Sequence, residues 1–472
     1  MRQKLLAAVA ATFALSACVN TADTASTQKQ LPATPKNIIM IVADGMGPAY
    51  TTAYRNFRDN PDTPEVERVV LDNIFVGNAS TYPDLVSGFV TDSAASATAL
   101  ASGVKSYNGA IGVDKNKKPV TSILQRAKQL GMRTGVAVTS QIVHATPASY
   151  VAHNESRQNY NELADSFFDD RINGQFVADV MLGGGTRYFE REDRNVTAEF
   201  IDAGYAYVDT YNKLATLPAG ENVLGLFAEV GLPWALDDLR KNRLAYLTEH
   251  AIKHLENDKG FFLLVEASQV DWAGHSNDIA AAMAEMHDLN LALEYLVSYV
   301  EEHPDTLVVL TADHSTGGLT IGARGEYRWA PEWLHKLKQS PVTIAQNMTK
   351  ADSPAAYVSE ALGFKLNDEE SSQVTELAKQ ADLEARFDGI KALLDIRSNT
   401  GWTTTGHTGV DVEVFAFGAG SSQFYGQYDN TDIAKKLFGL LPKSAPAVKT
   451  LTKTVSQEEK SQCDFETDWR CE

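Results

Sequence analysis

The sequence predicts an α/β fold with a central, largely parallel sheet. Five short apolar runs rich in Val, Ile, Leu and Phe indicate buried strands at 37–43, 134–139, 261–265, 306–310 and 412–417. Helical patterns separate these runs, and the clearest spans 278–303, with apolar residues at spacings of three, four or seven. Continuous apolar strands that alternate with helices are typical of sheets covered on both faces.

Length and charge narrow the class of protein. The chain has 472 residues, enough to bury a large core without disulfides. Its 42 Lys and Arg against 61 Asp and Glu give a formal charge of −19. The sequence has no cluster of Lys and Arg that could bind the phosphates of a nucleic acid, which argues against a nucleic-acid partner. A small anionic substrate remains compatible, because bound divalent cations can reverse the local field.

The first eighteen residues predict an export signal with a lipobox. Arg2 and Lys4 precede an apolar run at 5–15 that is too short to span a bilayer. Residues 15–18, LSAC, resemble a bacterial lipobox, which predicts lipidation of Cys18; the alternative is an ordinary signal peptide cleaved near Ala17. We therefore expect a periplasmic or cell-surface protein held to the membrane by a lipid anchor only. Residues 19–35, rich in Thr, Ala and Ser, predict a flexible tether.

Two stretches resemble insertions in the predicted α/β domain, at 165–250 and at 323–400. The second is expected to form an accessory subdomain, which divides the α/β domain into 36–322 and 401–440. A C-terminal tail follows at 441–472 and contains Cys463 and Cys471. In an exported chain these two cysteines are expected to form a disulfide, and two free thiols are the alternative.

Most of the polar residues that can bind metals follow the predicted strands directly, and His407 precedes the last of these strands. In open α/β sheets, ligands bind beyond the carboxyl ends of the strands, so a single site explains this placement. Imidazoles with carboxylates suit Zn²⁺, carboxylates with hydroxyls suit Mg²⁺, and a two-metal site can stabilise both oxygens of an in-line displacement. The candidate ligands are Asp44, Glu266, Asp271, His275, Asp313, His314 and His407.

Ser93 is the candidate nucleophile. It opens an Ala-rich run, 93–99, that favours a helix, and either Asp92 or Ser93 can serve as its N-cap. The start of a helix favours a bound anion such as a phosphoryl group. Serine at a helix start is usually no more than a cap, but beside a metal its hydroxyl can lose a proton and attack.

Six motifs resemble those of the alkaline phosphatase family, in family order, between residue 36 and about residue 440. They are IVADGMG at 41–47, TDSA at 91–94, VHATPA at 143–148, VE at 265–266 with Asp271 and His275, TADHS at 311–315 and GHTG at 406–409. The resemblance implies a three-layer sandwich with an inserted, crown-like accessory subdomain. It also implies hydrolysis of small phosphate monoesters at alkaline pH. Family members are commonly dimers, so a homodimer is implied, for which the 323–400 insertion offers an interface.

The resemblance also implies a role for each site residue. Ser93 would pass through a phosphoserine intermediate, and Arg157 would grip two phosphate oxygens, a task that suits a planar guanidinium. Asp271, His275 and His407 would hold one zinc. Asp44, Asp313 and His314 would hold the second, and Asp44 would bridge to a third metal, Mg²⁺, completed by Thr146 and Glu266.

Two positions depart from the best-known bacterial pattern. His144 stands where an Asp often supports the third metal, and imidazole shifts such a site from Mg²⁺ towards Zn²⁺ or Co²⁺. Trp272 stands where a Lys often contacts phosphate through water. Losing that Lys is expected to weaken product binding and to speed product release.

Three alternatives compete with this interpretation. A sulfatase needs a Cys or Ser followed by x-Pro-x-Arg, whereas Ser93 is followed by AASA, so that activity is disfavoured. A phosphodiesterase on the same scaffold remains open. A lipoprotein that binds phosphate or metal without turnover also remains open, but it would have little need for the hydroxyl of Ser93.

Overall fold

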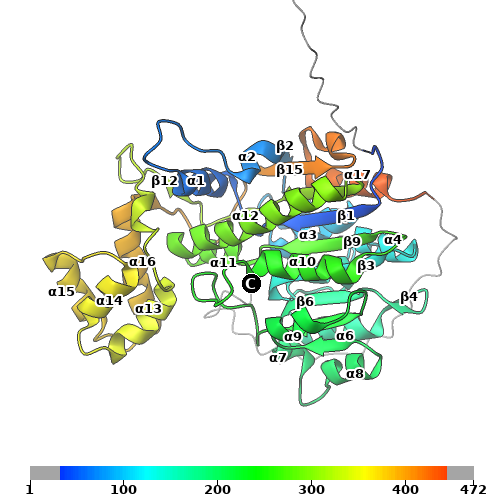
Figure 1. Ribbon diagram of the computed structural model, residues 1–472, viewed down its shortest axis with the longest axis horizontal. Coiled ribbons are helices and arrows are strands. Elements are labelled where there is room, and N and C mark those ends of the chain that lie inside the picture. Colours follow the sequence, from blue (N-terminus) through cyan, green and yellow to red (C-terminus); the bar gives the residue numbers. More distant parts are fainter. Residues whose placement is uncertain (1–31, 444–472) are drawn as a thin grey trace, which may run out of the picture.

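The computed structural model describes residues 32–443, which are built around one ten-stranded sheet (Figure 1). Its strands lie in the order β16-β2-β15-β10-β1-β9-β3-β6-β8-β7. Strand β15 is antiparallel to β10 and β2, and the other strand pairs of this sheet are parallel. The predicted α/β fold is confirmed. The strands are β1 Asn37–Val42, β2 Phe75–Ser80, β3 Arg133–Gln141, β6 Val180–Gly184, β7 Ala206–Val208, β8 Val223–Leu226, β9 Phe261–Glu266, β10 Thr306–Thr311, β15 Val412–Gly418 and β16 Gly426–Asp429.

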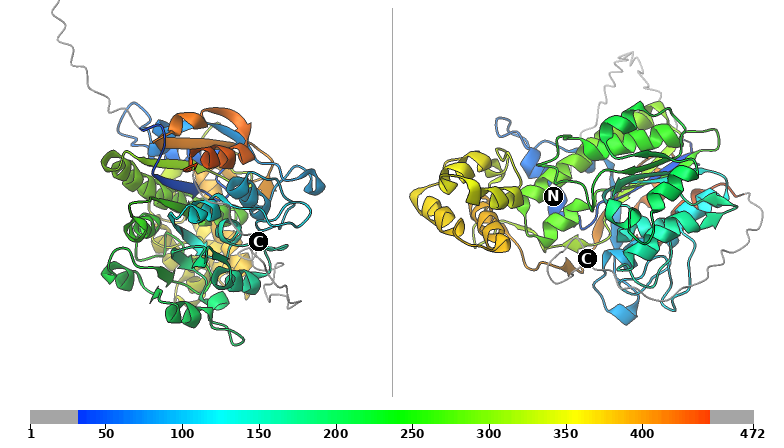
Figure 2. Two further views of the ribbon diagram at one scale, coloured as in Figure 1. Left: turned by 90° about the vertical axis from the view of Figure 1, so that its right-hand side faces the viewer. Right: turned by 90° about the horizontal axis from the view of Figure 1, so that it is seen from below.

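Helices cover both faces of the sheet and form the outer layers of a sandwich (Figures 1 and 2). Helices α10, Arg243–Leu255, and α12, Ile279–Glu302, pack together on one face. Helices α3, Ser93–Ser102, α4, Ile123–Gln129, α5, Ala145–Val151, and α17, Asn430–Leu440, cover the other. The predicted helix at 278–303 corresponds to α12, whose N-cap Asp278 accepts hydrogen bonds from the amides of Ala280 and Ala281. Its apolar stripe faces the core, as the spacing predicted.

The stretch at 165–250 does not form an insertion outside the sheet, so that prediction is corrected. Strands β6, β8 and β7 extend the central sheet by parallel pairing beyond β3. These strands have only five, four and three residues, and glycines fall within two of them, so their sequence carries little strand signal. The helices of this region are α6 Tyr160–Asp169, α7 Thr186–Phe189, α8 Val196–Asp202 and α9 Tyr211–Thr216.

Residues 323–400 form a mostly helical group at one end of the molecule (Figure 1). The carboxylate of Asp237, in a loop of the sheet region, accepts hydrogen bonds from the amide and the hydroxyl of Ser340. Lys391 donates to the backbone carbonyl of Ser276, which directly follows His275. This group therefore contacts the segment that carries a candidate metal ligand. Its helices are α13 Pro341–Asn347, α14 Pro354–Leu362, α15 Asp368–Leu377 and α16 Leu383–Ser398.

The ends of the chain lie outside the described residues. These ends include the predicted signal peptide with Cys18, most of the tether, and the tail from residue 444 with Cys463 and Cys471. Within residues 32–443, no helix has the length and apolar composition that crossing a bilayer requires.

Candidate active site

Ser93 begins helix α3 and is almost completely buried. The N-cap is Asp92, whose side chain accepts a hydrogen bond from the amide of Ala95 at 2.9 Å. Capping by Asp92 leaves the Ser93 hydroxyl available for another contact, and its Oγ lies 3.1 Å from Nε2 of His314. The serine therefore points at one of the predicted metal ligands.

The first metal group consists of Asp271, His275 and His407. His275 Nδ1 donates to the Thr405 carbonyl at 2.6 Å, and His407 Nδ1 donates to the Thr91 carbonyl at 2.8 Å, because a carbonyl oxygen can only accept. With the ring protons on Nδ1, both Nε2 atoms carry lone pairs. These two lone-pair atoms lie only 3.1 Å apart, an arrangement that a shared cation would stabilise.

The second metal group consists of Asp44, Asp313 and His314, all with 0% exposed side chains. Nε2 of His314 lies 3.3 Å from a carboxylate oxygen of each aspartate. The other oxygen of Asp313 accepts from the amide of Gly45 at 3.0 Å. Gly45 has a φ of +70°, and a Cβ there would lie 2.7 Å from an oxygen of Asp271, so this close approach requires glycine.

The third metal group shares Asp44 with the second and adds His144 and Glu266. One oxygen of Glu266 accepts from the hydroxyls of Ser268, at 2.7 Å, and Ser140, at 3.2 Å. These bonds orient the carboxylate and leave its other oxygen, Oε1, without a hydrogen-bond partner among the described residues. A carboxylate held in this way presents one oxygen to a cation.

Electrostatics in the second and third groups favour bound cations. Burial raises the pKa of Glu266 to about 7, and burial together with Asp271 raises the pKa of Asp313 to about 7. Burial and the neighbouring Asp313 also raise the pKa of Asp44. Within residues 32–443, both oxygens of Asp44 and Oδ2 of Asp313 are buried without a hydrogen-bond partner. Divalent cations would satisfy these oxygens and their charge, so the residues present fit a metal site.

Arg157 lies between the third metal group and the cap of helix α3. Its Nη1 is 3.1 Å from the Asp92 carboxylate, and its Nη2 donates to Nε2 of His144 at 3.2 Å. Burial and the charge of Arg157 lower the pKa of His144 to about 3, so this imidazole is neutral. Thr146, two residues after His144 in helix α5, is also fully buried. The guanidinium is thus held between His144 and Asp92, the residue that precedes Ser93.

Trp272 occupies the interior and does not line an open cleft. Its side chain is 2% exposed, and its ring meets the His144 ring edge-on, with centroids 5.9 Å apart. A Cβ on Gly231 would lie 2.4 Å from the indole, so the loop around Gly231 packs directly on it. Trp272 therefore contacts the third metal group through the ring of His144.

The structure groups the predicted carboxylate and imidazole ligands at the edge of the sheet where β1, β9, β10 and β3 end, and Ser93 lies beside His314 there. It also shows supporting residues that the sequence analysis missed, namely Ser140, Ser268 and Thr316. A single serine or threonine has no pattern of its own. Their positions in the sequence were the one indication of a supporting role, since Ser268 lies two residues after Glu266 and Thr316 lies two residues after His314.

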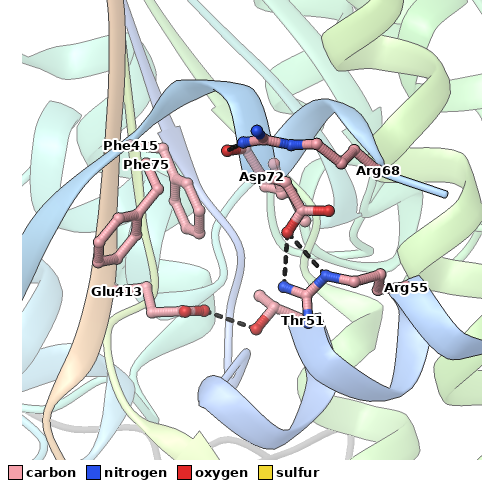
Figure 3. Close-up of a pocket in the computed structure, with 8 residues that line it drawn as sticks. Thr51, Arg55, Arg68, Asp72, Phe75, Glu413 and Phe415 are labelled. Atoms are coloured by element: carbon pink, nitrogen blue, oxygen red, sulfur yellow. Dashed lines mark hydrogen bonds and ion pairs between the residues drawn. The ribbon is translucent and has the colours of Figure 1, made fainter. Parts of the chain in front are cut away.

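A separate cavity of about 370 Å³ shares no residue with the metal groups (Figure 3). Thr51, Arg55, Asp72 and Glu413 are among its lining residues. Arg55 donates twice to Asp72, at 2.8 and 2.5 Å, and Thr51 donates to Glu413. Because none of the three groups of candidate metal ligands lines this cavity, it does not compete with them as the phosphate site.

Comparison with known proteins agrees with this geometry. Over residues 35–442 the chain matches the family described as alkaline phosphatase. It is 45% identical to alkaline phosphatase 4 of Bacillus subtilis, over 88% of this chain and 91% of that protein. It is 52% identical to the cold-active alkaline phosphatase of a psychrophilic Shewanella, with a TM-score of 0.82, over 86% of this chain and 100% of that one.

A more distant structure is that of an alkaline phosphatase from the Antarctic bacterium TAB5, in a variant with one histidine changed to aspartate and Mg bound in its M3 site. It is 27% identical to this chain, with a TM-score of 0.65, over 87% of this chain and 99% of that one. The family match covers most of the chain, and the metal groups surround a buried serine at the ends of the strands. The chain described here belongs to the alkaline phosphatase family.

Proposed function

We propose that this enzyme hydrolyses phosphate monoesters through a phosphoserine at Ser93, in a site that holds two zinc ions and a third metal. The observation that carries the proposal is the cluster of three metal groups, two of them sharing Asp44, in which Nε2 of His314 lies 3.1 Å from the buried hydroxyl of Ser93. Asp271, His275 and His407 would hold one zinc, and Asp44, Asp313 and His314 the other. Metal ions there would supply Lewis acidity that lowers the pKa of the serine hydroxyl and neutralises the leaving oxygen.

The residues of the chain then perform two displacements. Ser93 Oγ attacks the phosphorus and forms a Ser–O–P bond, while the P–O bond to the alcohol breaks. Water next cleaves the phosphoserine, which releases inorganic phosphate and restores the hydroxyl. Arg157 would bind two phosphate oxygens in both steps, since its fork of N–H donors matches that geometry. Its contacts with Asp92 and His144 hold it in place for this task.

Comparing a monoester with a diester tests the proposed reaction. Zinc-loaded protein is expected to hydrolyse p-nitrophenyl phosphate much faster than bis(p-nitrophenyl) phosphate. A preference for the diester would instead establish the phosphodiesterase alternative. Binding of phosphate without turnover of either ester would establish the non-catalytic alternative.

We propose that the third site, at Asp44, His144, Glu266 and Thr146, prefers Zn²⁺ or Co²⁺ to Mg²⁺. An imidazole ligand supports this preference. The structure of the TAB5 enzyme with a histidine changed to aspartate and Mg in its M3 site is consistent with it. His144→Asp is expected to raise the Mg²⁺ content of this protein by about one ion per chain, since Mg²⁺ prefers oxygen ligands. The measurement is metal analysis after equilibration with both ions, with His254→Asn as a control away from the site; an unchanged Mg²⁺ content would contradict the proposal.

We propose that Trp272 weakens the binding of product phosphate. An indole at this position supplies no cation, and its edge-on packing against His144 leaves phosphate recognition to Arg157 and the metals. Trp272→Lys is therefore expected to lower the inhibition constant of inorganic phosphate, on the order of tenfold for one added charge–charge contact in a partly dry site. Trp272→Phe serves as the control that keeps the ring. An unchanged inhibition constant in the lysine variant would rule out this role.

We also propose that the enzyme is exported, anchored through a lipid on Cys18, and dimeric. Support for the anchor is the LSAC sequence after the apolar run. Support for a partner surface is the loop before Ser93, which exposes Leu85, Val86 and Phe89 by 68%, 71% and 77%. Cys18→Ser is expected to move the protein from the detergent phase to the aqueous phase in phase partitioning, and an unchanged distribution would contradict the anchor. A single-chain mass in solution would contradict the dimer.

A further inference from the structure

Thr316 lies between the first and second metal groups. It belongs to the short strand β11, Ser315–Thr316, which pairs antiparallel with β14, His407–Thr408, so that Thr316 stands opposite His407. Its amide donates to the Gly45 carbonyl at 3.1 Å, and its carbonyl accepts from the Tyr50 hydroxyl at 2.9 Å. The residue is fully buried. Hydrogen bonds at both its amide and its carbonyl thus hold the backbone of Thr316 in place.

The hydroxyl of Thr316 contacts one ligand from each group. It donates to Oδ1 of Asp271, in the first group, and lies 3.1 Å from Nδ1 of His314, in the second. An ionised carboxylate can only accept hydrogen bonds, so the Thr316 hydroxyl donates its one hydrogen to Asp271.

The direction of the first hydrogen bond decides that of the second. Because the Thr316 hydroxyl donates its hydrogen to Asp271, its oxygen can only accept a hydrogen bond from His314. Nδ1 of His314 therefore carries the ring proton. The lone pair of His314 is then on Nε2, the atom that faces Ser93, Asp44 and Asp313. One hydroxyl therefore sets both the orientation of Asp271 and the tautomer of His314.

We propose that Thr316 is a positioning residue that couples the two metal groups, so that losing its hydroxyl weakens metal binding at both. Without that oxygen, His314 is free to carry its proton on Nε2, which would place an N–H, in place of a lone pair, facing Asp44 and Asp313. Asp271 loses its donor in the same substitution. The inference rests on the proposed function only in requiring that the two groups bind zinc.

The space around Thr316 limits which substitutions are informative. A Cβ on Gly45 would lie 2.6 Å from the Thr316 hydroxyl, and a Cβ on Gly274 would lie 2.9 Å from its Cβ. Larger residues would therefore displace the ligand loops. Thr316→Val removes the hydroxyl at nearly constant volume, Thr316→Ser keeps it, and Thr316→Ala removes it with no risk of overpacking. Thr197→Val is the matched control, because the Thr197 hydroxyl is buried in α8, without a hydrogen-bond partner within residues 32–443.

The first measurement is the tautomer of His314 in metal-free protein, from ring ¹⁵N chemical shifts assigned with His314→Gln. Wild type, Thr316→Ser and Thr197→Val are expected to carry the proton on Nδ1, whereas Thr316→Val and Thr316→Ala lose this preference. The second measurement is zinc content against increasing chelator. Compared with wild type, Thr316→Val and Thr316→Ala are expected to lose both zinc ions at an about 10-fold lower chelator concentration. An effect of this size is typical when a residue that hydrogen-bonds to a metal ligand is lost.

Each outcome decides the proposal. It is overturned if Thr316→Val and Thr316→Ala keep the wild-type tautomer of His314, or if they weaken the binding of only one zinc ion or of neither. It is also overturned if Thr316→Ser differs from wild type in its tautomer or its zinc binding. Neither measurement uses turnover. Absence of monoester hydrolysis would therefore refute the proposed function and leave this inference standing.

Discussion

Ser93→Ala is expected to lower kcat for p-nitrophenyl phosphate by ~10³-fold or more while leaving the metal content unchanged. The substitution removes the Oγ atom that lies 3.1 Å from His314 and retains the helix start, which Asp92 caps. Alanine also suits the Ala-rich helix α3, so the fold is expected to persist. Activity that remains would come from direct attack by water.

Ser102→Ala is the matched control, since this serine ends the same helix and its hydroxyl donates to the Thr98 carbonyl. It is expected to keep wild-type turnover. Metal analysis of both variants, with the rate of p-nitrophenol release, separates loss of a nucleophile from loss of the site. Substantial turnover in Ser93→Ala with full metal content would remove Ser93 from its proposed role.

Asp44→Asn is expected to lower metal content by more than one ion per chain and kcat by ~10³-fold or more, because it neutralises a carboxylate shared by two metal groups. Asn offers one neutral oxygen in place of two charged ones at almost the same volume.

Asp179→Asn is the control for a buried aspartate, because Asp179 accepts from Lys128 at 2.7 Å and belongs to none of the metal groups. It is expected to reduce stability and to leave metal content unchanged. Elemental analysis of both variants after dialysis gives the measurement. Loss of a single ion from Asp44→Asn would show that Asp44 does not bridge the second and third groups.

The sequence predicted the strands that carry the site because each is a continuous apolar run. Strands β1, β9 and β10 are fully buried on both faces, so nearly every residue in them had to be apolar. Strand β2, by contrast, reads FVGNAS and mixes polar with apolar residues. Strands β6 to β8 are short and gain their stability from pairing with neighbours, which local sequence does not record.

The site was predictable where chemistry requires particular residue types. Imidazoles and carboxylates after strand ends indicate metals, and the structure brings His275, His407 and Asp271 to one point. The hydroxyl of Thr316 was not predictable, because its role depends on two partners 45 and two residues away and on the direction of each hydrogen bond. Similarly, the burial of Trp272 under the Gly231 loop depends on a contact between distant segments.

The order in which the ligands occur along the chain has a consequence for biosynthesis. Asp44 follows the first strand of the sheet, whereas His407 comes shortly before β15. A chain that is still being made therefore lacks the first metal group until more than 400 residues have been joined. The first and second metal groups then assemble only once strand β1 has paired with its neighbours β9 and β10. Such a hydrolase is inert as a nascent polypeptide, and its activity begins only with the completed, folded chain.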